Sequence, residues 1–224
     1  FGYDKPSRFR PSAPPALDSR TYTIDYNEVK DFRRATESSR TAEQSATALF
    51  WSPSASALWS ANVRSLASSM DLLTAARFEA IGIAAVTNAL IACWDAKYTY
   101  LFWRPVTAIR VGDTDCNYAT EPDPTWSPFI VTPSHPEYPA AHSTVGASVL
   151  GFYTVWFGTR HLSLEFRGNG GLVRNYTSVN EIHEEQGNAR VCAGMHWRNS
   201  TEVGTAVGSK VGKYTARHLL KPLD

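Results

Sequence analysis

The chain has 224 residues, and 43% of them are hydrophobic, which is enough to bury a core and excludes disorder of the whole chain. Its 22 Lys and Arg residues balance 21 Asp and Glu residues, so the net charge is +1. A near-neutral chain is not expected to bind nucleic acid or an anionic membrane through its overall charge. Any anion site must therefore be local.

The first 45 residues are rich in proline and mixed charge, whereas 46–224 are expected to form one domain. Segment 1–45 predicts an extended arm, with at most one short helix at 26–35, that lies across a partner surface. Small and apolar residues then recur at helical spacing over 54–70, and Asp71 can cap the helix that follows.

Segment 72–103 is the longest predicted helix because it contains no proline, is rich in Ala and Leu, and stops before Pro105. Its most apolar stretch, 81–94, is shorter than the ~20 residues that a membrane span needs. We therefore expect a buried helix of a soluble protein and no membrane span.

A proline-rich loop over 122–139 precedes the last predicted helices, which cover 141–157, 179–188 and 197–220. In the final helix Gly204, Gly208 and Gly212 recur every four residues, so they share one face and allow another helix to approach closely. The predicted fold class is all-α, a helical bundle with long proline-rich loops.

The cysteines and the glycosylation sequons indicate in which cellular compartment the protein is expected. Three cysteines are too few for a disulfide scaffold; we expect one bridge, Cys116 to Cys192, because both lie in loop-like sequence while Cys93 lies in an apolar helix. Sequons at Asn175 and Asn199 favour a secretory compartment, although a glycan at Asn199 would crowd the predicted site. The polar opening of the chain lacks a signal peptide, which was removed or never present.

Two cations of the long helix have unusual surroundings. Lys97 and Arg104 are seven residues apart, so they share a helix face, and aromatic residues surround both. A buried cation costs several kcal/mol unless a counter-charge meets it. Either their charged ends reach water, or they pair with an acidic residue such as Asp95, or they bind an anion.

Two histidines strengthen the anion interpretation. His142 falls in the first turn of a predicted helix, where free N–H groups and the helix dipole favour an anion. Arg190 and His196 are six residues apart, which is off-register for one helix face, but a turn near Gly194 would let them converge. A single site that gathers three cations and two histidines is the prediction.

Three spaced segments carry a family resemblance: Lys97-(six residues)-Arg104-Pro105, Pro139-x-x-His142 and Arg190-(five residues)-His196. In order and spacing they resemble the signature of the vanadium-dependent haloperoxidase and type 2 phosphatidic acid phosphatase superfamily. The text around Trp103 and His135 is similar to the soluble haloperoxidase branch.

This resemblance implies a helical bundle that binds vanadate, or phosphate or sulfate in the same place. The groups that would hold its oxygens are Lys97, Arg104, Arg190 and the backbone N–H of Ala141. His196 would be the vanadium ligand or the phosphatase nucleophile, and His142 the general acid and base.

The chain departs from the family pattern at four positions: Ala140 and Ala189 replace serines, Ala141 replaces a glycine, and Ser200 replaces an aspartate. That aspartate normally orients the imidazole of the histidine ligand. Ser200, Glu202 or a backbone carbonyl could substitute. Since a lost hydrogen bond to a charged group costs about 1.5–3 kcal/mol, we expect anion binding to persist and catalysis to weaken.

Trp94 and His135 form the predicted halide pocket. Trp94 matches an aromatic residue that flanks the pocket in chloroperoxidase-like members. His135 lies seven residues before His142, where chloroperoxidases resemble one another in carrying Phe and bromoperoxidases in carrying His. The resemblance therefore favours bromide; the alternative is a loop histidine bonded to the backbone.

Three functions stay open. The first is an enzyme that oxidises a halide with hydrogen peroxide and halogenates a small organic substrate. An acid phosphatase that cleaves phosphomonoesters through a phosphohistidine is the second. The third is a non-catalytic storage or defence protein that keeps the anion pocket.

The short length of this chain, compared with soluble haloperoxidases, suggests that it associates with another copy or with a further region. Soluble haloperoxidases are much longer than this chain, which resembles their C-terminal half, so we expect a homo-oligomer or pairing with a missing N-terminal region.

The remaining histidines match no motif and are expected at surface or structural positions: His161, His183 and His218. A solvated helix face is expected for Glu181, Glu184 and Glu185.

Overall fold

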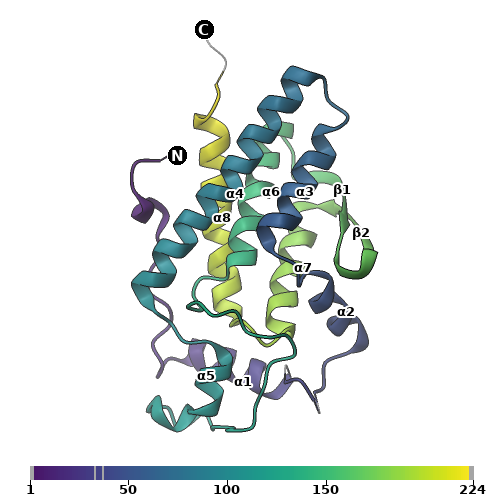
Figure 1. Ribbon diagram of the computed structural model, residues 1–224. Coiled ribbons are helices and arrows are strands. Elements are labelled where there is room, and N and C mark those ends of the chain that lie inside the picture. Colours follow the sequence, from purple (N-terminus) through teal and green to yellow (C-terminus); the bar gives the residue numbers. More distant parts are fainter. Residues whose placement is uncertain (1–2, 33, 37, 222–224) are drawn as a thin grey trace.

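Helices dominate the computed structural model, which describes residues 3–32, 34–36 and 38–221 (Figure 1). The α-helices are α1 (Arg20–Phe32), α2 (Ala42–Phe50), α3 (Ala55–Ala67), α4 (Leu72–Tyr100), α5 (Pro105–Arg110), α6 (Ala141–Phe157), α7 (Val179–Cys192) and α8 (Arg198–His218). An antiparallel hairpin of β1 (His161–Arg167) and β2 (Val173–Ser178) connects α6 to α7. The predicted helical bundle is confirmed.

The bundle is built around α6, which contacts α3, α4, α7 and α8 (Figure 1). The main core fills the space between these helices with aliphatic and aromatic side chains, among them Phe78, Val145, Phe152 and Val211. Helices α1 and α5 lie at one end of the bundle, together with the proline-rich loop (Figure 1). The candidate site lies where this loop meets the ends of α4 and α7 and the start of α8.

Close packing of α8 on α6 depends on the glycine face of α8. A Cβ atom on Gly208 would overlap the carbonyl oxygen of Thr144, and one on Gly212 would overlap that of Ser148. The prediction that these glycines allow a second helix to approach is confirmed.

The start of α4 and the bounds of α6 agree with the prediction. Asp71 accepts hydrogen bonds from the backbone N–H groups of Leu73 and Thr74, both at 3.1 Å. However, α4 ends at Tyr100 because Leu101 adopts a left-handed conformation, with φ of 49°. The prediction of a helix up to residue 103 is therefore wrong at its last turn.

The hairpin and α2 were not predicted. In β1 the apolar residues alternate, so that Leu164 and Phe166 are buried against the core while their neighbours face outward. Alternation over so short a segment is easily missed when helical spacing is sought. Helix α2 begins with a capping box between Thr41 and Gln44.

Segment 1–45 lies across the chain's own bundle. Arg10 forms two hydrogen bonds of 2.7 Å with Asp95 of α4, and the Tyr138 hydroxyl donates to the carbonyl of Ser12. The helix in this segment is α1 rather than the predicted 26–35, because Tyr22 and Tyr26 turn into an aromatic cluster with Trp197. This cluster joins α1 to the start of α8.

The disulfide prediction is wrong, since no disulfide joins Cys116 to Cys192. Cys116 is exposed in the loop after α5, whereas Cys192 is buried at the end of α7 beside Ala193 and Met195. The segment Leu72–Arg110 is long and apolar enough to cross a membrane, but half of its most apolar window is buried within the protein. That burial is typical of the core helix of a soluble protein.

Candidate anion-binding site

Three cationic side chains are buried at one end of the bundle. Lys97 lies in the last turn of α4, Arg104 directly precedes α5, and Arg190 lies in the last turn of α7. Their exposed fractions are 0%, 6% and 1%. Within the described ranges no carboxylate lies at ion-pair distance from any of the three. The site therefore concentrates positive charge away from water.

Backbone carbonyls solvate two of these cations. Lys97 Nζ donates to the carbonyl oxygens of Pro136 and Glu137, both at 2.7 Å, and Arg104 donates to those of His135 and Met195. Burial nevertheless lowers the pKa of Lys97 to about 8. Carbonyl dipoles replace water around the cations, but they do not neutralise the charge.

Of the three buried cations, Arg190 has the weakest set of hydrogen-bond partners for its charge. Its Nη1 donates to the Trp51 carbonyl at 3.3 Å, and its Nη2 contacts the Met195 sulfur at 3.3 Å. Its Nε is buried and has no hydrogen-bond partner in the described part of the chain. Burial, together with the charge of Arg104, lowers the pKa of Arg190 to about 9. A buried guanidinium with a free donor indicates an absent anion.

His196 lies two residues before α8, and its two ring nitrogens have different surroundings. Arg104 Nη1 lies 3.0 Å from Nε2, and Glu137 Oε1 lies 2.6 Å from Nδ1. Because a guanidinium only donates, Nε2 must carry the lone pair, and Nδ1–H donates to Glu137. Burial and the nearby cations lower the pKa of His196 well below its usual value. His196 is thus a neutral imidazole with its Nε2 lone pair among the cations.

His142 lies at the start of α6. Its Nε2 is 2.9 Å from the carbonyl oxygen of Pro53, so Nε2 carries the proton and Nδ1 the lone pair. Burial and the charge of Arg190 lower the pKa of His142 well below its usual value. Ala140 at the N-cap provides no side-chain cap, so the N–H of Ala141 is available for an anion.

The part of the chain that carries this site matches a known protein family. Residues 77–224, more than half of the chain, match the sequence model of the VCPO second helical-bundle domain. The chain belongs to this family. It is thereby a member of the vanadium haloperoxidase and type 2 phosphatidic acid phosphatase superfamily.

Solved structures agree on the fold of this VCPO-type domain. A bacterial vanadium-dependent iodoperoxidase aligns with a TM-score of 0.79 and 27% identity, covering 97% of this chain and 55% of that protein. The holo form of a bacterial vanadium-dependent chloroperoxidase aligns with a TM-score of 0.77 and 18% identity, covering 97% of this chain and 52% of that protein. The chain thus spans about half the length of each. No curated protein matches it.

Glu137 is the residue of the VCPO-type domain that sequence reasoning missed. The expected partners of His196 do not contact its ring: Ser200 has a buried hydroxyl beside Glu137, and Glu202 is exposed. Burial raises the pKa of Glu137 to about 7, although Lys97 and Arg104 oppose this shift. The sequence signal was a single acidic residue between two loop prolines, and no periodicity marks such a residue as buried.

The two predicted halide-pocket residues are neighbours. The ring centroids of Trp94 and His135 are 5.0 Å apart, and Arg104 Nη2 lies 3.1 Å from His135 Nδ1. The same Nδ1 lies 3.2 Å from the Pro136 carbonyl oxygen, but because a guanidinium can only donate, we assign Nδ1 as the acceptor and the proton to Nε2. Burial and the charges of Lys97 and Arg104 lower the pKa of His135 to about 4. The structure brings both residues to the edge of the cationic cluster.

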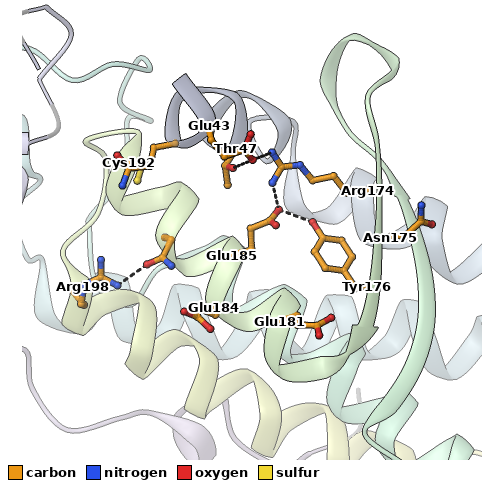
Figure 2. Close-up of a pocket in the computed structure, with 12 residues that line it drawn as sticks. Glu43, Thr47, Arg174, Asn175, Tyr176, Glu181, Glu184, Glu185, Cys192 and Arg198 are labelled. Atoms are coloured by element: carbon orange, nitrogen blue, oxygen red, sulfur yellow. Dashed lines mark hydrogen bonds and ion pairs between the residues drawn. The ribbon is translucent and has the colours of Figure 1, made fainter. Parts of the chain in front are cut away.

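A separate cavity of about 700 Å³ lies between α2, β2 and α7 (Figure 2). Figure 2 shows Arg174 reaching Glu43 and Glu185, at 2.6 and 2.7 Å. Glu185 also accepts hydrogen bonds from Trp51 Nε1 and the Tyr176 hydroxyl. The prediction of a solvated glutamate face is therefore wrong for Glu185, which ties β2 to α7.

Proposed function

We propose that this chain binds vanadate between its three buried cations and His196, and that the enzyme it belongs to oxidises a halide with hydrogen peroxide. The observation that carries the proposal is the excess of buried positive charge, above all the unpartnered Nε of Arg190. Among the described residues no carboxylate pairs with these three cations, and the Glu137 carboxyl contacts His196 and the Trp197 backbone instead, so an oxyanion with more than one negative charge suits the site.

Each residue has a role that follows from its chemistry. Arginine forks can hold two oxygens of a tetrahedral or five-coordinate anion, and a lysine meets one as a point charge. The Nε2 lone pair of His196 lies 3.0 Å from Arg104 Nη1 and is the nitrogen that would bond to the central atom. Ala141 adds a backbone N–H at the start of α6.

His142 is proposed to move protons. Its Nε2–H is held by Pro53, so Nδ1 is the atom that can take the proton which hydrogen peroxide loses on binding as an anion. Because burial keeps His142 neutral, Nδ1 is ready to accept at neutral pH. Bound vanadate supplies the Lewis acidity that makes a peroxide oxygen electrophilic towards a halide.

Bromide is the proposed halide. His135 presents a neutral ring with a proton on Nε2, and the Trp94 ring beside it makes the edge of the site partly apolar. A neutral N–H donor next to an aromatic face suits a large, weakly hydrated halide. Expected halogenation rates are therefore higher with bromide than with chloride.

The proposal is tested by bromination of a phenolic dye with vanadate-loaded protein and hydrogen peroxide. Wild-type protein should brominate the dye, and Arg190→Met should lose at least 100-fold of that activity because an oxyanion contact is gone. Arg174→Met, which removes a partly exposed arginine from the separate cavity, should keep it.

Two results would overturn the proposal. One is equal bromination by wild-type protein and Arg190→Met. The other is hydrolysis of a phosphomonoester, with an acid-labile phosphohistidine at His196 and no bromination, which would favour the phosphatase alternative. Silence in both assays, with phosphate still bound, would identify a non-catalytic protein.

A further inference from the structure

Glu137 occupies a position that none of the expected residues fills. It lies in the loop before α6, its side chain is fully buried, and its Oε1 accepts from His196 Nδ1–H at 2.6 Å and from the Trp197 backbone N–H at 3.1 Å. Trp197 is the N-cap residue of α8. The carboxylate therefore holds the ring of His196 and also the first turn of the helix that carries it.

The backbone of Glu137 is fixed on both sides. Its N–H donates to the Phe102 carbonyl at 2.9 Å, and its own carbonyl accepts from Lys97 Nζ at 2.7 Å. Phe102 and Lys97 belong to the end of α4 and the turn after it. A side chain anchored so closely can impose one orientation on its partner, because neither residue can move without breaking several bonds.

The carboxylate comes from a different element than the family pattern predicts. Ser200 stands where the aspartate is usual, and its hydroxyl is buried without a hydrogen-bond partner in the described part of the chain. A serine there is too short to replace the lost carboxylate. Glu137 contributes a carboxylate from the loop, across 59 positions of sequence.

We infer that Glu137 is the positioning residue of this site: together with Arg104 on Nε2, it holds the ring of His196 in the Nδ1–H tautomer, so that the Nε2 lone pair faces the bound oxyanion. The inference depends on the proposed function for the identity of that oxyanion. Its claim about the tautomer of His196 holds independently.

The first test reads the tautomer directly. Long-range ¹⁵N–¹H NMR spectra of the full chain, without any added anion, should show His196 protonated at Nδ1. Glu137→Ala should lose the downfield shift and the slow exchange of that Nδ1 proton, because the acceptor is gone, whereas Ser200→Ala should keep both. Retention of the downfield shift in Glu137→Ala, or its loss in Ser200→Ala, would overturn the inference.

The second test separates positioning from charge and uses Glu137→Gln. The amide oxygen can still accept from Nδ1–H, so the fold should survive while the negative charge is lost. Phosphate needs no bond to Nε2, and its affinity should stay the same or rise because a like charge is removed. Vanadate affinity should stay close to the wild-type value in Glu137→Gln, because the ring of His196 is still held, and should fall about 10- to 100-fold in Glu137→Ala, where the partner of the metal-binding histidine is removed.

The ratio of vanadate to phosphate affinity is thus the decisive quantity. An unchanged ratio in Glu137→Ala would overturn the inference, and so would a fall in Glu137→Gln as large as that in Glu137→Ala, which would indicate that the charge of Glu137 matters and not its hold on the ring. If wild-type protein binds phosphate but not vanadate, the proposed function fails, while the NMR test still decides the role of Glu137. Glu185→Gln, which changes a carboxylate in the separate cavity, should leave the ratio unchanged.

Discussion

At the scale of single residues, the site is defined by charges that the fold leaves uncompensated. Arg190 is 1% exposed and Lys97 is 0% exposed, yet their partners in the described part of the chain are carbonyl oxygens and a thioether. Placing such groups in the interior costs stability, and a bound oxyanion returns it. The protein therefore gives up stability in the unloaded state in order to bind an anion.

The variant Arg190→Met tests this cost. Without an anion, it should unfold at the same temperature as wild-type protein or higher, because a buried unpaired charge is replaced by an apolar side chain of similar length, a change worth about 1–4 kcal/mol in comparable cases. With phosphate, the wild-type melting temperature should rise and that of the variant should not. Thermal unfolding with and without phosphate measures both effects. A phosphate-dependent rise in the variant would contradict the prediction.

At the scale of elements, the contact between α6 and α8 sets the geometry of the site. His142 lies in the first turn of α6 and His196 two residues before α8, so any change in the distance between these helices moves the two histidines apart. The glycine face of α8 keeps that distance short. Thus a packing feature far along the helix also controls the chemistry at its start.

Gly208→Ala should therefore destabilise the protein and weaken phosphate binding. The new Cβ would overlap the Thr144 carbonyl oxygen, and because backbone must move, we expect a loss of about 1–3 kcal/mol. Gly187→Ala is the matched control: its Cβ would lie 3.5 Å from Thr201 Oγ1, an ordinary contact, and alanine favours the helix. Equal stability of the two variants in urea unfolding would refute this account.

At the scale of the whole molecule, buried histidines make stability depend on pH. Besides the site histidines, His183 of α7 has a pKa lowered to about 4 by burial and by the charges of Arg160 and Lys213. Below pH 6.5 His183 is protonated in the unfolded chain but stays neutral in the folded chain until the pH approaches 4. The contribution of His183 to the free energy of unfolding is therefore fully present above pH 6.5 and decreases as the pH drops towards 4.

In His183→Gln the free energy of unfolding should decrease less steeply as the pH falls. Between pH 7 and pH 4 the stability of wild-type protein should fall by about 2 kcal/mol more than that of the variant, a value reduced from the full linkage effect because part of the ring is exposed. Thr205→Val alters the same surface cavity without a titrating group and should shift the profile while keeping its shape. Parallel pH profiles for wild type and His183→Gln would exclude the effect.

The sequence by itself determined the features that depend on local patterns. Helical spacing and proline positions gave the bundle and the bounds of α6, and fixed spacings picked out Lys97, Arg104, Arg190 and His196, which all lie in one cluster. These signals are readable because a helix relates residues three to seven positions apart.

Only the tertiary structure decided which groups meet. The contact of Glu137 with His196 joins residues 59 positions apart, one of them in an irregular loop where no period exists. The tautomers of both site histidines, the lack of a disulfide between Cys116 and Cys192, and the path of the described part of segment 1–45 over the bundle are likewise long-range outcomes. A hydrogen bond between a loop and a helix end depends on the whole packing, so no local pattern encodes it.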